Sequence, residues 1–419
     1  MANTPISYTA VWWVPDGSRR FSDKQHVGTL TYNEESHSVL EVYFDRLQGS
    51  IFRAYENYDV IWGQSTGGQV FTLFNAVLVR QEDFSKAMFD VNYILIGAHI
   101  KSLEEPCFDT CVSSFPFLKH WAMSQRFKEE SKDDIVSFHL DMGKREPITS
   151  VNLEKGVRAY LWGQLSYHLS RFELSAKQTT NFNIEVEGKT SIQGYLSLIS
   201  EFSQFFSIAV FSPQYPNEVK FKNKGQEQYV SLLYKVQPST DPRFISLIKF
   251  DKLRDRIPAM LEKWHTEHEQ VAPIANYLIR SLRYDTPFDA PDFLIIAQAL
   301  DGYFKRFVNK KDGKDTRKYK DGIDKLLKQF KDVELLRKCK IDSEVLTQSR
   351  DKYSHLLPDD DKKNQKAVED SDLYWLTQKC KILLTCCILD LLGLTTEEIN
   401  LCCNQSPLGF IVNSLPFEP

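Results

Sequence analysis

The chain has 419 residues, of which 42% are hydrophobic and 26% charged, with a formal net charge of -4 at pH 7. This hydrophobic content, with 28 Phe and 18 Tyr, excludes a chain that stays unfolded. The length exceeds what one hydrophobic core usually serves, so we expect two domains. The small negative charge argues against nucleic-acid binding over the whole surface.

The ends of the chain and its cysteines indicate a cellular compartment. No basic-then-apolar leader opens the sequence, and no apolar run approaches the roughly 20 residues that span a bilayer. Eight cysteines are too sparse for a disulfide framework, and four of them form adjacent pairs. We therefore expect a soluble, cytoplasmic protein whose thiols are reduced and mostly buried.

The first half of the chain has the pattern of β structure. Residues 39–44 alternate with period two, and turn signals at Asp16-Gly17, Gly67-Gly68 and Glu187-Gly188 separate aromatic and β-branched runs. One helix is expected over 192–206, where apolar residues recur at helical spacing. The pattern is typical of a sandwich or of layered antiparallel sheets.

From about Phe244 the pattern becomes helical and stays so nearly to the end of the chain. We expect an α+β multidomain protein with a β-rich, sandwich-like part over 1–245, a helical connector over 246–287 and a helical bundle over 288–419. The expected helices are 253–264, 272–282, 291–307, 323–333, 342–357 and 373–392. Asp342 is the expected N-cap of the fifth of these, and Gly393 the C-cap of the last.

One segment is basic although the chain as a whole is acidic. Between Asp301 and Arg350, 15 Lys or Arg outnumber 9 Asp or Glu by six. This segment could attract a phosphate backbone.

The helix expected over 342–357 carries the residues of greatest chemical interest. Arg350 is followed by Asp351 and, five positions after the arginine, by His355. This resembles the signature of HEPN nucleases, in which an arginine, a polar residue and a later histidine lie at the end of a bundle helix.

The spacing occurs elsewhere in the same chain, since Arg19 and Arg20 precede His26 by permitted distances. Those matches lie in a β-rich region beside a turn and lack the helical context. An alternative for Arg350 and His355 is that both are surface residues of a solvated helix.

A second element lies upstream, where Asp301 precedes Lys305 and Arg306. It resembles the acidic residue, three residues and basic pair found in many HEPN nucleases. Asp301 and Lys305 share a helix face, so the alternative is an ordinary surface ion pair.

The resemblance implies RNA cleavage without a metal or another cofactor, in which the ribose 2'-OH attacks the adjacent phosphorus. A histidine can change its charge near neutral pH, so His355 would move the proton. Arg350 would grip the phosphate oxygens and stabilise the developing charge. Asp351, Asp301 and Lys305 would have supporting roles. Products with cyclic 2',3'-phosphate ends and activity in the presence of a chelator are expected.

The five-residue spacing raises a geometric problem. On an uninterrupted helix it corresponds to a rotation of about 140°, so Arg350 and His355 would not share a face. Either the helix deforms near Tyr353, or two copies of the motif meet. HEPN domains pair their motifs across a dimer, so the resemblance implies a composite site at a homodimer interface.

Several segments of the first half are similar to the N-terminal domain of ApeA-type proteins. They are Trp12-Trp13-Val14-Pro15, Gly28-Thr29-Leu30, the stretch 62–73, Ile96-Gly97-Ala98-His99 and Trp121. With the HEPN domain, the resemblance covers most of the chain. It implies an anti-phage ribonuclease that acts by abortive infection and stays inactive until a phage-derived trigger reaches the N-terminal sensor.

Alternatives from other classes remain. The helical part could be a catalytically silent HEPN module that binds RNA or a protein, or the chain could be a β-sandwich binding protein whose helices only dimerise. The β-rich part could be a plain scaffold whose aromatic residues fill its core. Transfer RNA is a candidate substrate by family analogy alone.

Two groups of residues contain types that can bind a metal. His265 and His268 lie near Glu262 and Glu269 but lack the spacing of a zinc protease helix. Cys107 and Cys111 would need two further ligands, so buried thiols are expected instead.

Overall fold

The computed structural model describes residues 5–14, 24–34, 36–44, 57–82, 85–122, 127–132, 135–140, 146–171, 173–242, 246–283, 290–309, 318–358 and 364–414. The chain forms a β-rich unit (1–118, 126–199 and 215–238) and a helical unit (119–125, 200–214 and 239–419). This confirms the expected α+β multidomain class. The domain boundaries at 245 and 287 stay a prediction. Arg19 and Arg20 lie outside the described residues.

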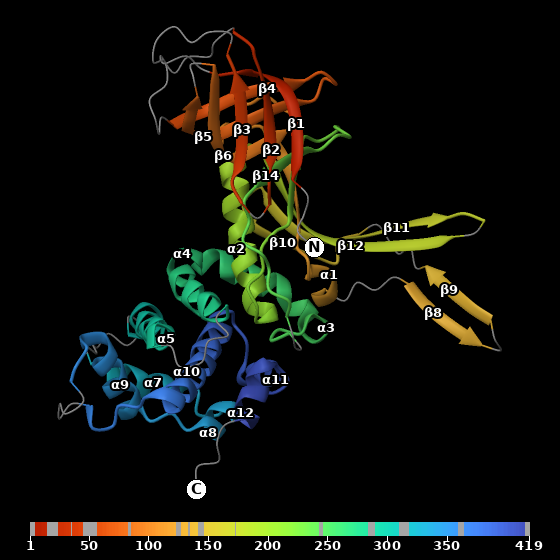
Figure 1. Cartoon of the computed structure of the whole chain (residues 1–419). Coiled ribbons are helices and arrows are strands. Elements are labelled where there is room, and N and C mark those ends of the chain that lie inside the picture. The colour runs from red at the N-terminus through yellow and green to blue at the C-terminus, as the bar shows by residue number, and fades with distance from the viewer. Residues whose placement is uncertain are drawn as a thin grey trace. The chain divides into compact units, whose positions relative to one another are not determined.

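The first six strands of the β-rich unit form a closed antiparallel barrel, drawn in red and orange in Figure 1. They are β1 (Ile6–Trp13), β2 (His26–Tyr32), β3 (Ser38–Tyr43), β4 (Asn57–Ser65), β5 (Val70–Glu82) and β6 (Lys86–Ile96). Their order is β6-β3-β2-β1-β4-β5, and the pairing of β5 with β6 closes the ring. Closure satisfies the backbone groups that an open sheet would leave at its edges.

The Trp12 side chain lies in the interior of the barrel and restricts which residues can lie beside it on the neighbouring strands. Its side chain is fully buried. Gly63 lies directly opposite Trp12 in the register of β1 and β4, and a Cβ at Gly63 would lie 2.3 Å from the indole ring. A Cβ at Gly28 on β2 would lie 2.9 Å from the same ring. Both glycines are therefore required by the close approach of the tryptophan.

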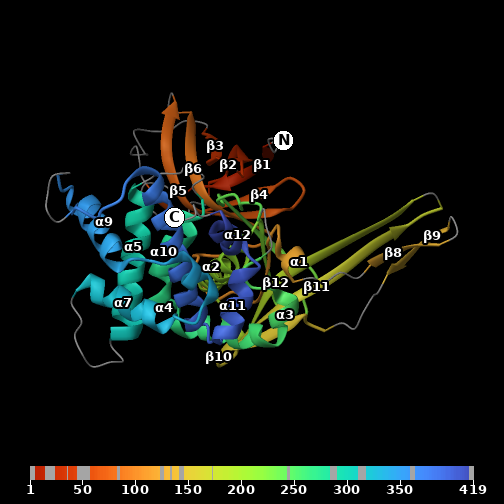
Figure 2. The same ribbon diagram turned by 90° about the horizontal axis from the view of Figure 1, so that it is seen from below.

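The sheet continues from β6 into an open antiparallel layer in the order β14-β13-β7-β12-β11-β10. These strands are β7 (Phe108–Ser114), β10 (Thr149–Glu154), β11 (Val157–Leu169), β12 (Leu174–Thr190), β13 (Glu218–Lys222) and β14 (Val230–Tyr234). Figure 2 shows β11 and β12 extending beyond the layer as a two-stranded arm. A separate pair consists of β8 (Phe127–Lys132) and β9 (Ile135–Leu140).

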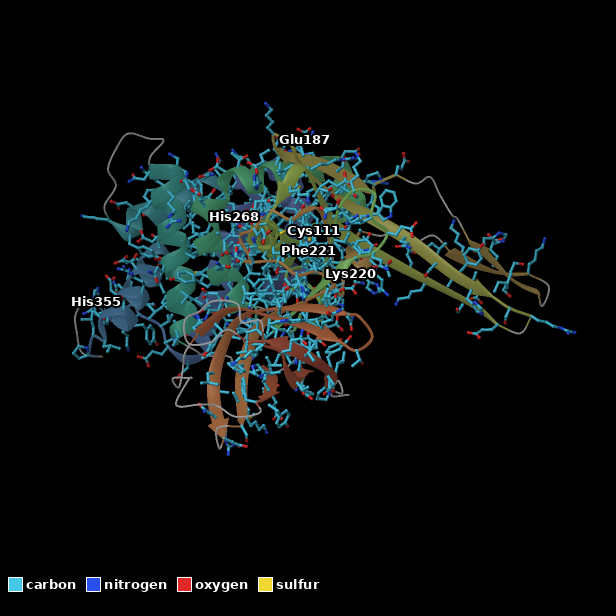
Figure 3. All side chains as sticks on the ribbon, turned by 90° about the horizontal axis from the view of Figure 1, so that it is seen from above. Cys111, Glu187, Lys220, Phe221, His268 and His355 are labelled. Carbon is cyan, nitrogen blue, oxygen red and sulfur yellow. The ribbon has the colours of Figure 1, made fainter. Side chains whose placement is uncertain are left out.

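One face of the open layer is apolar and buried. Five residues from five strands lie in register across it, namely Val151, Ala159, Ile184, Cys111 and Phe221. The first part of α2 (Ile192–Val210) packs on this face, with the Tyr195 ring 5.6 Å from the ring of Phe221. Figure 3 labels Cys111 and Phe221. The helix expected over 192–206 is thus confirmed.

The turn predicted at Gly67-Gly68 joins β4 and β5, with φ of +81° at Gly68. The turn predicted at Glu187-Gly188 is wrong, because both residues lie within β12, where Gly188 has φ of +92°. Asp16-Gly17 lies outside the described residues.

The helical unit contains the remaining helices. They are α1 (Leu118–Trp121), α3 (Phe250–Leu253), η1 (Arg254–Arg256), α4 (Ile257–Ser281), α5 (Ala290–Tyr303), η2 (Phe304–Val308), α7 (Tyr319–Gln329), α8 (Glu334–Cys339), α9 (Ser343–His355), α10 (Asp370–Leu391), α11 (Thr396–Asn404) and α12 (Pro407–Asn413). Among the described residues, none of these helices has the length and apolar character that crossing a membrane requires.

The expectation of two connecting helices, over 253–264 and 272–282, is wrong. The structure has a single helix there, α4, with Pro273 inside it. Trp264, Val271 and Ile274 keep helical spacing and are buried, so packing maintains the helix across the proline.

The bundle forms around α10, which is buried along most of its length and packs against α5, α7 and α8. The predicted N-cap is confirmed, because the Asp342 side chain accepts hydrogen bonds from the backbone N–H groups of Glu344 and Val345. Gly393, with φ of +83°, directly follows the α10 C-cap residue Leu392. Its left-handed conformation explains why a glycine ends this helix.

Candidate functional site

The last two turns of α9 are fixed from their buried side. Ser349 is fully buried, and its Oγ accepts a hydrogen bond of 3.0 Å from the backbone N–H of Val368. The Tyr353 hydroxyl donates to the carbonyl oxygen of Val368 at 3.2 Å. The segment before α10 thereby holds the part of α9 that carries Arg350.

Arg350 is held by two neighbours. Its Nη1 lies 2.7 Å from Oδ1 of Asp351, and its guanidinium carbon lies 5.2 Å from the centroid of the Tyr319 ring. The arginine side chain remains 34% exposed. The guanidinium is therefore oriented while part of it stays accessible to an anion.

Tyr319, at the start of α7, connects the two predicted motifs. Its hydroxyl donates to the carbonyl oxygen of Ala297 on α5 at 3.1 Å. Burial raises the pKa of Tyr319 well above its ordinary value, with a further contribution from Asp301, whereas Arg350 acts to lower it. Asp301 and Arg350 therefore both influence the ionisation of one hydroxyl, in opposite directions. Sequence reasoning missed Tyr319, since no local pattern links it to Arg350.

Asp301 and Lys305 form the i,i+4 ion pair that their spacing predicts, with Nζ 2.7 Å from Oδ2. Asp301 is 20% and Lys305 56% exposed. The helix changes to a π-helical turn, η2, between these two residues. Arg306 is directed elsewhere and donates to the carbonyl oxygen of Gln270 on α4. Of the basic pair, Lys305 is the one that solvent reaches more freely.

His355 is the last residue of α9 and is exposed. Figure 3 labels it at the outer edge of the helical unit. The helix remains regular through Tyr353, so the deformation considered from the sequence is absent and the rotation of about 140° applies. One chain therefore does not bring His355 to the face that carries Arg350. The following residue, Leu356, is left-handed, with φ of +49°, and 87% exposed.

His265 and His268 face a carboxylate of α2. The Nδ1 atom of His265 lies 2.7 Å from Oε2 of Glu201, and Nδ1 of His268 lies 3.8 Å from its Oε1. Burial lowers the pKa of His268, an effect that Glu201 opposes. Within the described ranges, no three His, Cys, Asp or Glu side chains are arranged to hold a metal ion.

All eight cysteines are free thiols, and seven of them are buried, with Cys107 partly exposed. Burial raises the pKa of Cys339 to about 11 and that of Cys380 to about 12. Thiols with such pKa values stay protonated and unreactive near neutral pH. The expectation of mostly buried cysteines is confirmed.

Three of the N-terminal segments singled out in the sequence meet at the barrel. The rings of Trp62 and His99 stack with centroids 5.2 Å apart, and Trp13 lies edge-on to His99 at 6.0 Å. His99 Nε2 is also 3.0 Å from the carbonyl oxygen of Gly63. Trp121 instead belongs to the helical unit, where it donates to the carbonyl oxygen of Ile248. Trp13 and Trp62 are partly buried and His99 is exposed, so this aromatic group lies at the surface of the barrel.

Two family models match the chain. Residues 7–264 match the model described as ApeA N-terminal domain 1, and residues 294–398 match the Apea-like HEPN model. No curated protein and no solved structure matches the chain significantly. The second match includes Asp301, Arg350 and His355. Because the first match covers more than half of the sequence, the chain belongs to the ApeA family and carries a C-terminal HEPN domain.

Proposed function

We propose that this protein is a metal-independent endoribonuclease of an anti-phage abortive-infection system that acts in the cytoplasm. The observation that carries the proposal is the placement of Arg350 within the HEPN-matched bundle. Asp351 and Tyr319 hold its guanidinium, which remains partly exposed. A cation that is oriented before substrate arrives stabilises a developing phosphorane without reorganisation.

The reaction requires no metal and conserves all atoms. The ribose 2'-oxygen forms a bond to the adjacent phosphorus, and the bond from phosphorus to the 5'-oxygen breaks. His355 accepts the 2'-OH proton and later releases it to water, and water supplies the proton that the departing 5'-oxygen takes up. Such acid–base assistance contributes roughly 10²- to 10⁴-fold in rate. Arg350 stabilises the charge on the phosphate oxygens, with Asp351, Asp301 and Lys305 in supporting roles.

We further propose that each active site takes Arg350 from one copy and His355 from a partner in a homodimer. The regular course of α9 supports this, since a rotation of about 140° separates the two side chains on one helix. The exposed, left-handed Leu356 beside His355 also supports a surface that another molecule covers.

The substrate is RNA, because DNA lacks the 2'-OH nucleophile, and transfer RNA is one candidate. A phage-derived trigger acting at the N-terminal domain would release the activity. The two family matches support this proposed regulation by analogy.

A second candidate function is a catalytically silent HEPN module that binds RNA or a protein partner. The ion pairs of Asp301 with Lys305 and of Asp351 with Arg350 favour it, since each neutralises a basic side chain within one chain. Internal pairing of this kind is typical of a structural surface.

Sequencing of RNA ends during phage challenge separates the two candidates. Cells expressing the wild-type protein should accumulate new cyclic 2',3'-phosphate ends, and cells expressing His355→Ala should not. His120→Ala, which removes another exposed histidine of the helical unit, is the matched control and should behave as wild type. Identical RNA ends in wild type and His355→Ala would support the silent module.

A further inference from the structure

The solvent face of the open layer in the β-rich unit carries a groove of about 940 Å³. It lies on the side opposite the apolar row of Cys111 and Phe221. Four of its lining residues, from four adjacent strands, lie in register as Arg158, Glu185, Thr110 and Lys222. Directly opposed residues of a sheet point to the same face, so this row forms the floor of the groove.

Two turns and one irregular part of β12 form the walls. The turns contain Gly156, with φ of +79°, and Gly225, with φ of +86°, and β12 has Gly188, with φ of +92°, where its register shifts. Residues other than glycine are strained at such backbone angles. Because glycine has no side chain, the backbone of the walls is accessible at these positions.

The charges of the groove are mixed and ordered in space. Its four basic residues are Lys155 and Arg158 at the β10–β11 end and Lys222 and Lys224 at the β13 end. Three acidic residues lie between these two basic ends of the groove. They are Glu185 and Glu187 on β12 and Asp109 on β7. Glu154 completes a set of four acidic residues.

The internal contacts leave the charges of the basic groups without an opposite charge. The Arg158 guanidinium carbon lies 5.2 Å from the centroid of the Tyr160 ring and Lys222 Nζ 5.0 Å from that of Tyr229, and neither ring neutralises the cation. Asp109 accepts hydrogen bonds from the Thr110 hydroxyl at 2.8 Å and from the backbone N–H of Lys224 at 2.7 Å. Glu185 accepts one from the Tyr160 hydroxyl at 2.7 Å. Within the part of the chain that the structure describes, none of the four basic side chains forms an ion pair.

The arrangement of charges in the groove indicates which class of ligand it can bind. Equal numbers of acidic and basic residues give no surplus positive field, which a nucleic-acid surface requires. The lining is too polar for the apolar pocket that drug-sized molecules prefer. A polypeptide carries both signs of charge as well as backbone donors and acceptors.

We infer that this groove binds an extended polypeptide segment with acidic side chains near both ends and a basic side chain at its centre. From Arg158 on β11 to Lys222 on β13 the row spans three inter-strand distances, about 14 Å, which corresponds to roughly four extended residues. The inference concerns the β-rich unit alone, so its failure would leave the proposed ribonuclease unaffected.

Selection from a random eight-residue peptide library on the immobilised full-length protein tests the inference. The enriched peptides should carry Asp or Glu near both ends and Lys or Arg in the middle. The double variant Arg158→Glu, Lys222→Glu should reduce capture of these peptides about tenfold or more and select basic ends instead. Glu187→Lys, a single exposed change, should weaken capture of the same peptides.

The matched control is Lys128→Glu, Lys132→Glu, which makes the same change of charge on β8, away from the groove, and should leave capture unchanged. The inference is wrong if the groove variants capture the peptides as wild type does, or if no peptide is enriched. It is also wrong if a short oligouridylate probe binds in place of peptides and the double variant abolishes that binding, which would indicate a nucleic-acid groove.

Discussion

The guanidinium carbon of Arg350 lies 5.2 Å from the centroid of the Tyr319 ring, and the hydroxyl of that ring is hydrogen-bonded to the backbone of α5. A cation over an aromatic face contributes about 0.5 to 2 kcal/mol, depending on exposure. The contact joins α9 and α7 at the residue proposed to stabilise the cleaved phosphate. Tyr319 is therefore a positioning residue for Arg350.

Tyr319→Leu is expected to reduce RNA cleavage about tenfold, because the arginine loses the aromatic face that orients it. Tyr319→Phe keeps the ring and loses only the hydrogen bond to Ala297, so it should cleave nearly as wild type. Counting of new RNA ends, with thermal melting of both variants, measures the effect. Equal cleavage by the two variants at equal melting temperature would remove the proposed role of the ring.

The substitution Asp351→Asn tests whether Asp351 orients the Arg350 guanidinium without contributing much to the stability of the fold. The pair with Arg350 is about one-third exposed on both sides, so its loss should change the free energy of unfolding by less than about 1 kcal/mol. Cleavage should nevertheless fall several-fold, since the guanidinium loses a fixed partner. Asp324→Asn, at an exposed position of α7, is the control for the change of charge. Unchanged cleavage in Asp351→Asn would show that this pair has no part in the reaction.

Lys381 and Asp292 form a buried ion pair in the interior of the bundle, with Nζ 2.8 Å from Oδ2 and exposures of 6% and 12%. Lys381→Ala leaves the carboxylate unpaired and should destabilise the unit by about 3 to 5 kcal/mol. The double change Lys381→Met, Asp292→Asn should recover most of this loss, since it removes both charges and keeps the side-chain volumes similar. Urea unfolding measures both, and a single variant as stable as wild type would contradict the prediction.

The stability of the protein should fall as the pH drops below neutrality. Burial lowers the pKa of His268, so the unfolded chain takes up a proton at a higher pH than the folded one. The stabilisation is complete above the ordinary histidine pKa of about 6.5 and is lost as the pH falls through the lower, folded-state value. Thermal melting from pH 7.5 to pH 5 should show a smaller decrease in His268→Gln than in wild type. His120→Gln, at an exposed position, should follow wild type. A parallel decrease in all three proteins would contradict this assignment.

Local signals in the sequence predicted much of the helical unit. The Asp342 cap, the glycine after α10 and the apolar face of α5 depend on neighbours within a few positions, and the structure confirms them. Pairings between distant segments could not be predicted. The closure of β5 onto β6 and the fit of Trp12 against Gly63 depend on register across the barrel.

The candidate site likewise contains one contact that the sequence predicts and one that it does not. The pairing of Asp301 with Lys305 follows from helix periodicity, and the structure contains it. The position of Tyr319 beneath Arg350 depends on how α7 packs against α9, which no spacing encodes. The single helix α4 shows the converse, since buried residues on both sides of Pro273 outweigh the local signal of a break.

The most direct test of the composite site is co-expression of an Arg350→Ala chain with a His355→Ala chain. Neither variant alone should cleave RNA. Random pairing gives about half mixed dimers, each with one complete site formed by His355 of the first chain and Arg350 of the second. RNA cleavage should therefore return to about a quarter of the wild-type level. Cleavage that stays absent in the mixture, although the two chains co-purify as a dimer, would contradict a site shared between two copies.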